Sequence, residues 1–324
     1  MIFNLKRKKV PRFSVVIPLY NKEKDILQTL NSLFLQTFTD FEVVVVNDGS
    51  TDKSGAIVQK LEDKRIQYFS KENEGVSKTR NLGVARANAQ HIVFLDADDY
   101  WYPNHLENLD TLIQEFPENP WYATAYEKRH HKNFTTSMIS PILEKGNNWK
   151  GLVPHYFENS LVDTLAWTSA VCFKKWFFEE LNGFDTQITH GAGEDTDLWL
   201  RAALEAPLAF SNTITARHNL DGSNRISNTP TLIRNFMELD AYEAEAKNHP
   251  GLKKYLDLNR FSFAMQHKMA GDQSTFKKFS AQITPENLTS KQRYMLKQPK
   301  SILRLLVKGK ALAEKLGIRL TSFN

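Results

Sequence analysis

The chain has 324 residues, of which 41% are hydrophobic and 24% charged, so it can bury a sizeable core in one large domain with an appendage or in two ordinary domains. No apolar run approaches the length that spans a bilayer, and Met1–Val10 lacks the apolar stretch of a signal peptide. The single cysteine, Cys172, excludes an internal disulfide and fits a reducing compartment. We therefore expect a soluble cytoplasmic protein.

The net charge of +5 is concentrated at the two ends of the chain. The basic residues of these ends are Lys6, Arg7, Lys8, Lys9 and Arg12, followed near the other end by Lys291, Arg293, Lys297, Lys300, Arg304, Lys308, Lys310, Lys315 and Arg319. Such ends suit an anionic membrane surface or a nucleic acid. We expect no nucleic acid as a partner, because few aromatic side chains interleave with these charges.

The first third of the chain alternates short apolar runs with helical patterns. Strands are expected at residues 13–19, 41–46, 65–69 and 91–95. Between the first two strands Leu27, Leu30 and Phe34 fall at helical spacing, and further helices are expected at 54–61 and 76–88. Repeated strand–helix–strand units predict an α/β protein with a mostly parallel sheet that is flanked by helices on both faces.

Polar residues follow three of these strands. Asn21 closes the first strand, Asn47–Ser50 the second and Asp96–Asp99 the fourth. Turns favour such residues anyway, so one loop of this kind indicates little. Because ligands of parallel sheets bind beyond the carboxyl ends of the strands, three such loops together predict a site at this edge.

The alternation weakens after Pro103. Helices are expected at 106–116 and 194–205, and the stretch 232–269 reads as mainly helical. We divide the chain into a basic arm at 1–12, a main domain at 13–226 and a helical region at 227–324. In the last region Ile302, Leu305, Leu306, Leu312 and Leu316 lie among basic residues. A helix of this pattern either lies on anionic lipid or packs on the main domain.

Asp96 and Asp98 are candidates for a metal site. Side chains at positions i and i+2 of an extended backbone point the same way, so both carboxylates can face one ligand. Hard divalent cations such as Mg²⁺ or Mn²⁺ prefer carboxylate and phosphate oxygens. An acidic turn that caps the following helix explains the same two residues without any ligand.

Residues 13–102 resemble the donor-binding half of family 2 glycosyltransferases, which share the GT-A fold. The matching segments are Val16–Asn21 (VIPLYN), Val46–Asp52 (VNDGSTD), Asn73–Gly75 (NEG) followed by Thr79–Asn81 (TRN), and Asp96–Asp99 (DADD), which stands where the family has its DxD motif. The resemblance implies a Rossmann-like GT-A domain that binds a nucleotide-sugar, with a mainly helical extension after it.

The resemblance also assigns individual roles. Pro18, Tyr20 and Glu23 would line the nucleotide pocket, and Asp48 would accept a hydrogen bond from the base, most simply from N3–H of uracil. Asn73 and Arg80 would lie near the base, ribose and diphosphate, and the forked guanidinium of Arg80 suits phosphate. Asp96 would contact ribose or sugar, and Asp98 would bind the metal. A surface arginine on a helix is the alternative for Arg80.

The pair Glu194–Asp195 stands where the family carries its ED pair, at the start of a predicted helix. An inverting transfer needs a base that takes the proton of the acceptor hydroxyl. We expect Asp195 to be this base and Glu194 to hold the acceptor or a loop. Acidic residues are common at helix N-termini for electrostatic reasons alone, which is the alternative.

Two further positions are candidates. The resemblance makes His218 a ligand of the metal or diphosphate, with Arg225 adding charge beside the leaving group; a surface histidine is the alternative. Trp167 could stack on an acceptor sugar, although aromatic side chains more often belong to the core. Cys172 lies in an apolar run and is expected to be inert.

These patterns predict an inverting, metal-dependent glycosyltransferase that moves a sugar from a nucleotide-sugar, preferably a UDP-sugar, to a hydroxyl of a glycan or lipid-linked acceptor in surface polysaccharide synthesis. The basic ends predict peripheral contact with the inner face of the cell membrane. A sugar nucleotidyltransferase is one alternative, but the loop Pro18–Glu23 lacks the glycines that such an enzyme needs. An inactive nucleotide- or glycan-binding module is another alternative.

Overall fold

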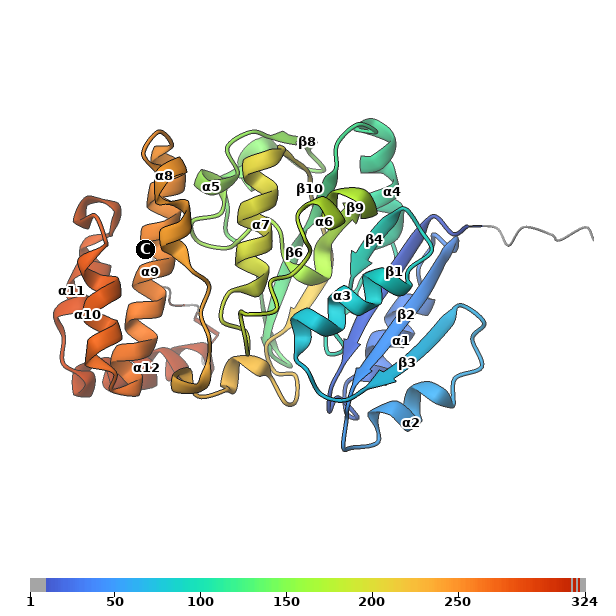
Figure 1. Ribbon diagram of the computed structural model, residues 1–324, viewed down its shortest axis with the longest axis horizontal. Helices are drawn as coiled ribbons and strands as arrows, with labels where there is room; N and C mark the ends of the chain where they lie inside the picture. The colour runs from blue at the N-terminus through green and yellow to red at the C-terminus, as the bar shows by residue number, and fades with distance from the viewer. Residues whose placement is uncertain (1–9, 316, 319, 321–324) are drawn as a thin grey trace, which may run out of the picture.

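In the computed structural model, which describes residues 10–315, 317, 318 and 320, the strands form one ten-stranded sheet (Figure 1). The strand order is β3-β2-β1-β4-β9-β6-β10-β5, with β7 paired to β6 and β8 to β10. The strands are β1 Phe13–Leu19, β2 Phe41–Asp48, β3 Ile66–Lys71, β4 His91–Phe94, β5 Tyr100–Trp101, β6 Trp121–His131, β7 Phe134–Ser137, β8 Lys150–Val153, β9 Val171–Lys174 and β10 Leu208–Asn219.

The sheet is mostly parallel in its first half. β1 pairs in parallel with both β2 and β4, and β2 pairs in parallel with β3. β9 enters antiparallel between β4 and β6, and β10 then runs parallel to β6. The chain moves outward from β1 to β3 and then returns to the other side of β1 as β4, so the direction of winding reverses between β1 and β4. A crevice forms at the carboxyl ends of strands on either side of such a point.

Helices pack on the sheet, and the C-terminal helices lie beyond one end of it (Figure 1). The helices are α1 Ile26–Phe34, α2 Ser54–Gln59, α3 Val76–Arg86, α4 His105–Glu115, α5 Tyr156–Asn159, α6 Lys175–Glu180, α7 Glu194–Glu205, α8 Glu243–Ala246, α9 Pro250–Ala270, α10 Gln273–Ala281, α11 Ser290–Lys297 and α12 Lys300–Lys315. α3 packs on β1 and β2, while α4 packs on β6 and β10. α8 to α12 gather at the end of the molecule away from β3.

The central strands form because their β-branched residues pack on both faces of the sheet. In β1 and β2 nearly every side chain is buried, as a strand covered by helices on both sides requires. α3 approaches β1 so closely that a Cβ on Gly83 would lie 2.3 Å from Cγ1 of Val16. A residue without a side chain is therefore needed where this helix crosses the strand.

The C-terminal helices share the core of the sheet. Leu252, Tyr255, Leu256 and Phe263 of α9 belong to the same apolar cluster as β1 and β4. This cluster continues across residue 226, where the sequence analysis divided the chain. None of the helices in the described residues combines the length and the apolar character needed to cross a bilayer.

The predicted α/β fold with a mostly parallel sheet is confirmed. The strand at 13–19 and the helix at 194–205 have their predicted bounds. The stretch 232–269 is mainly helical as predicted, with α8 and α9 supplying most of it and short 3₁₀ turns preceding α8. The strands β5 to β10 were not predicted, although they are six of the ten strands of the sheet.

Candidate active site

A cavity of about 360 Å³ opens at the carboxyl ends of β1 and β4, where the winding of the sheet reverses. Six segments far apart in sequence surround it: the end of β1 with the loop after it, the end of β2, the start of α3 with the loop before it, the loop after β4, the start of α7 with the loop before it, and the end of β10 with the loop after it. The lining residues are Pro18, Leu19, Tyr20, Lys22, Asp48, Asn73, Gly75, Val76, Thr79, Arg80, Asp96, Ala97, Asp98, Asp99, His190, Glu194, His218, Asn224, Arg225, Ile226 and Thr229. The expected site at this edge of the sheet is therefore a real cavity.

Asp48 lies at the wall of the cavity formed by the end of β2. Its carboxylate accepts hydrogen bonds from the backbone N–H of Glu74, at 2.9 Å, and of Gly75, at 3.0 Å. Lys71 forms an ion pair with the same carboxylate. Asn73 donates a hydrogen bond back to the backbone carbonyl of Asp48 at 3.0 Å. The end of β2 and the loop before α3 are thus fixed to one another before any ligand binds.

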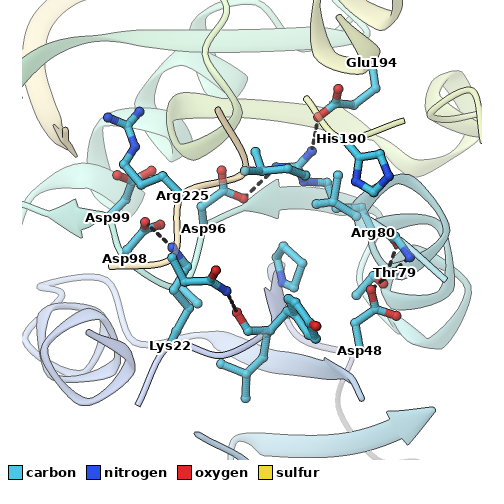
Figure 2. Close-up of a pocket in the computed structure, with 18 of the residues that line it drawn as sticks. Lys22, Asp48, Thr79, Arg80, Asp96, Asp98, Asp99, His190, Glu194 and Arg225 are labelled. Carbon is cyan, nitrogen blue, oxygen red and sulfur yellow. Dashed lines mark hydrogen bonds and ion pairs between the residues drawn. The ribbon is translucent and has the colours of Figure 1, made fainter. Parts of the chain in front are cut away.

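Arg80 is a buried cation between two acids, as Figure 2 shows. Its Nη2 donates a hydrogen bond to Oδ1 of Asp96 at 2.7 Å, and its Nη1 lies 3.6 Å from Oε1 of Glu194. The guanidinium also lies over the ring of Phe184, 5.1 Å from its centre. Nε and Nη1 are buried and have no hydrogen-bond acceptor among the described residues. A buried cation with unused donors is suited to an anionic ligand.

The acidic loop after β4 carries three carboxylates with different surroundings. Nζ of Lys22 donates a hydrogen bond to Oδ2 of Asp98 at 2.6 Å. Asp99 turns away from the solvent and accepts hydrogen bonds from Oγ of Ser169 at 2.6 Å and from the backbone N–H of Asn219 at 3.1 Å. Burial and the neighbouring carboxylates of Asp98 and Asp96 hold the pKa of Asp99 well above its usual range. All three carboxylates border the cavity, and Asp99 in addition anchors the loop through these two hydrogen bonds.

The loop after β10 closes one side of the cavity. Lys22 donates a hydrogen bond to the carbonyl of Ser223, and Ser223 donates from its backbone N–H to Asp25 at 3.1 Å. A Cβ on Gly222 would lie 2.7 Å from Oδ2 of Asp98, so this loop approaches the acidic loop closely. These contacts join the end of the main domain to the start of α1.

His218 lines the cavity from the end of β10. Its ring stacks on Trp167 with centroids 4.9 Å apart, and Nη2 of Arg225 lies 3.3 Å from its Nε2. Burial, together with the charge of Arg225, lowers the pKa of His218 to about 3, so the imidazole is neutral at physiological pH. Trp167 itself does not line the cavity; it is 7% exposed and packs between His218 and Tyr126.

Of the two acidic residues at the start of α7, Glu194 lines the cavity and Asp195 lies outside its lining. Glu194 lines the cavity, and its pKa is raised to about 7 by burial and by the negative charge of Asp195. Asp195 does not line the cavity and accepts a hydrogen bond from the backbone N–H of Thr196 at 2.7 Å. The two predicted catalytic acids therefore lie at one corner of the cavity, with Glu194 nearer to the space that a ligand would fill.

Most of the residues selected from the sequence meet in this cavity. Those that line it are Pro18, Tyr20, Asp48, Asn73, Arg80, Asp96, Asp98, Glu194 and His218. Glu23 lies outside the lining and accepts a hydrogen bond from the backbone N–H of Lys53 at the start of α2, at 3.1 Å. Lys22 and His190 also line the cavity but were not predicted from the sequence, and Thr79, which lies in the matching TRN segment, had no role assigned to it. Lys22 directly follows a strand-end loop and could have been found by that position, whereas no sequence signal marks His190.

The fold and the cavity define an α/β protein with a cavity of about 360 Å³ at the point where the winding of its sheet reverses. The profile of the family "Glycosyl transferase family 2" matches residues 14–177, half of the chain. The chain therefore belongs to family 2 of the glycosyltransferases, which confirms the resemblance drawn from its motifs.

Relatives with sequence similarity are glycosyltransferases and polysaccharide synthases. An uncharacterized glycosyltransferase of Rickettsia bellii is 44% identical over 97 residues, 30% of this chain and 14% of that protein. Chondroitin synthase of Escherichia coli is 28% identical over 219 residues, 67% of this chain and 30% of that protein. The chain thus spans less than a third of the length of these two relatives.

The fold is shared with a solved structure. The S. aureus TarS fragment 1–349, crystallised in complex with UDP-GlcNAc, aligns with a TM-score of 0.60 over 92% of each chain. At 19% identity this likeness concerns the fold alone. It agrees with the predicted GT-A architecture.

Proposed function

We propose that this chain transfers a sugar from a nucleoside diphosphate sugar, preferably a UDP-sugar, to a hydroxyl of a glycan or lipid-linked acceptor during polysaccharide synthesis, with inversion at the anomeric carbon. The observation that carries the proposal is Arg80, a buried guanidinium with unused donors that borders the same cavity as Asp96 and Asp98. The solved TarS complex with UDP-GlcNAc and the chondroitin synthase relative favour this donor and this pathway class.

The uracil preference rests on Asp48. Oδ2 of this carboxylate accepts one hydrogen bond from the described residues, that of the Gly75 N–H, and so retains an acceptor position. The N3–H of uracil is a donor that fits a carboxylate acceptor. A base that presents only a hydrogen-bond acceptor to the Asp48 carboxylate could not pair with it and would be repelled by its negative charge. This difference gives the proposed selectivity for uracil.

The diphosphate would bind where cations border the cavity. Arg80 and Arg225 line it from α3 and from the loop after β10, and Lys22 lines it from the loop after β1. Guanidinium and ammonium groups stabilise the charge that develops on a departing diphosphate. This chain therefore offers fixed positive charge to the leaving group from three separate elements.

The proposed cofactor is Mn²⁺ or Mg²⁺, held by Asp98 with Asp96 or His218 beside it. Among the described residues no three His, Cys, Asp or Glu side chains form a cluster that could enclose a metal ion. Mg²⁺ nevertheless often takes only one or two protein carboxylates and completes its shell with substrate phosphates and water. The carboxylates of Asp96 and Asp98 and the neutral imidazole of His218 fit that pattern. A bound cation would neutralise charge on the leaving diphosphate.

In the proposed reaction the acceptor hydroxyl loses its proton to a carboxylate at the start of α7, and its oxygen attacks the anomeric carbon. The bond from that carbon to the diphosphate oxygen breaks as the new glycosidic bond forms on the opposite face. We keep Asp195 as the proposed base and Glu194 as the group that holds the acceptor. General-base catalysis contributes roughly 10²–10⁴-fold, so Asp195→Asn is expected to lower kcat by that factor while leaving the donor Kd within a few-fold.

The test measures nucleoside diphosphate release and donor binding by the purified chain with UDP-, GDP- and CDP-sugars, in Mn²⁺, Mg²⁺ or a chelator. UDP-sugars should bind with the highest affinity and be hydrolysed slowly in the presence of metal. Asp98→Asn is expected to reduce turnover at least about 100-fold, because a metal supplies several kcal/mol of charge stabilisation. Unchanged turnover of Asp98→Asn, or release of pyrophosphate instead of UDP, would overturn the proposal.

A further inference from the structure

The last helix of the described chain, α12, presents an uncovered apolar surface. Its side chain Leu303 is 1% exposed and packs against the protein, whereas Leu305 and Leu312 are 67% and 61% exposed. At about 100° per residue, Leu305 and Leu312 lie almost opposite Leu303 on the helix. Ile302 and Leu306 continue this apolar surface on one side. The helix is therefore held by one edge and offers its other face to the surroundings.

Basic side chains border this apolar surface. Arg304, Lys308 and Lys315 lie on the side of the helix next to Leu312, and all three are exposed. Lys310 lies beyond the opposite border and forms a pair with Glu314 at 3.7 Å. α12 thus carries five basic residues against one acidic residue. Long basic side chains beside an apolar strip can reach phosphate groups while the strip enters the acyl region.

The rest of the protein fixes α12 in place. α12 packs on α9, and Nε2 of His131, in the β6–β7 hairpin, lies 3.2 Å from the carbonyl of Glu314. Figure 1 shows α12 along the same edge of the molecule to which the carboxyl ends of β1 and β2 point.

We propose that the exposed face of α12 binds a bilayer of anionic phospholipid. The basic charge of α12 favours a bilayer as the binding partner over a second copy of the chain. Pairing two copies of α12 would bring their basic borders together, and these would repel one another. An anionic bilayer instead neutralises those charges and covers the leucines. The exposed face of α12 would bind lipid whether or not the chain performs the proposed transfer.

The test is co-sedimentation of the full chain with vesicles of phosphatidylcholine alone or of phosphatidylcholine and phosphatidylglycerol in equal parts. We expect binding to the anionic vesicles that weakens with salt, and little binding to the neutral ones. The double variant Leu305→Ser, Leu312→Ser should lower the partition coefficient at least about ten-fold. Its control, Val307→Ser with Leu35→Ser, removes two equally exposed apolar side chains outside the strip and should bind as the natural chain does.

The charges are tested separately. The triple variant Arg304→Gln, Lys308→Gln, Lys315→Gln should lower binding to anionic vesicles by roughly 100-fold at low salt. A triple variant of exposed lysines near α2, at the far end of the molecule, is the matched control and should stay within about three-fold by the same rule; its substitutions are Lys53→Gln, Lys60→Gln and Lys64→Gln.

Three results would overturn the proposal. One is equal binding to neutral and anionic vesicles, and another is binding that the leucine variant leaves unchanged. The third is self-association of the chain that the leucine variant abolishes, without vesicle binding by either protein. Circular dichroism of each variant verifies that it remains folded.

Discussion

At the scale of single residues, Glu194 couples the site to the stability of the protein. Glu194 is 5% exposed, its Oε1 lies 3.6 Å from Nη1 of Arg80, and its pKa is raised to about 7 by burial and by the charge of Asp195. An unfolded chain ionises the same group near its ordinary value of 4.5. Between these two pH values the folded protein binds more protons than the unfolded chain, so the stability contributed by the neutral carboxyl is lost as the pH rises to about 7.

We therefore predict that Glu194→Gln removes the decrease in stability that ionisation of Glu194 causes as the pH rises. From about pH 5 to about pH 8 the free energy of unfolding of the variant, relative to the natural chain, should rise by roughly 2 to 4 kcal/mol. Urea unfolding at several pH values measures it. Glu205→Gln, at the exposed end of the same helix, is the control and should show no such change. A Glu194→Gln profile parallel to that of the natural chain would contradict the raised pKa.

At the scale of elements, the close contact between α3 and β1 places Arg80 over the cavity. Gly83 lies one turn after Arg80, and a Cβ there would meet Val16, whose branched side chain has little freedom to move. Gly83→Ala is expected to lower the free energy of unfolding by about 1 to 3 kcal/mol through overpacking. Urea or thermal unfolding measures this effect.

Gly309 in α12 is the matched control. Apart from its chain neighbours and the nearby backbone of its own helix, no atom of the described residues lies within 4 Å of a Cβ built there. Gly309→Ala should therefore leave stability unchanged or raise it by up to about 1 kcal/mol through helix propensity. If Gly83→Ala were as stable as Gly309→Ala, the result would contradict the close approach of α3 to β1 at Gly83.

At the scale of the whole molecule, the C-terminal helical part supports the corner of the cavity at the start of α7. The backbone N–H of Met237 donates a hydrogen bond to the carbonyl of Ala192 at 3.1 Å, and a Cβ on Gly193 would lie 3.0 Å from Sδ of Met237. These contacts hold the turn that begins α7, which carries Glu194. α9 adds Leu252 and Tyr255 to the core that includes the sheet.

A chain shortened after Thr229 is consequently predicted to fail to fold cooperatively, because it exposes this core and frees the start of α7. A chain shortened after Gln298 should keep its cooperative thermal transition, since Leu303 is the one residue of α12 that is buried in the described structure. Scanning calorimetry of both distinguishes them. Cooperative unfolding of the shorter chain near the natural Tm would show that residues 13–226 are an independent domain.

The sequence by itself determined the strand–helix order of the first third, the strand-end motifs and about half of the residues that line the cavity, because these depend on local periodicity and on residues next to one another. Only the tertiary structure decided that Trp167 supports His218 from outside the cavity, that Glu194 is nearer the ligand space than Asp195, and that Lys22 pairs with Asp98. Lys6 to Lys9 of the basic arm lie outside the described residues.

The late strands β6, β9 and β10 also depend on tertiary contacts and not on a local sequence pattern. β9 is four residues long and β6 ends in a run of polar side chains, so neither carries a clear period of its own. Their pairing with β4 and with one another buries them. Contacts between segments distant in the chain fix burial, and burial sets both the strands and the ionisation of the site; a sequence pattern records neighbours along the chain and therefore cannot contain that information.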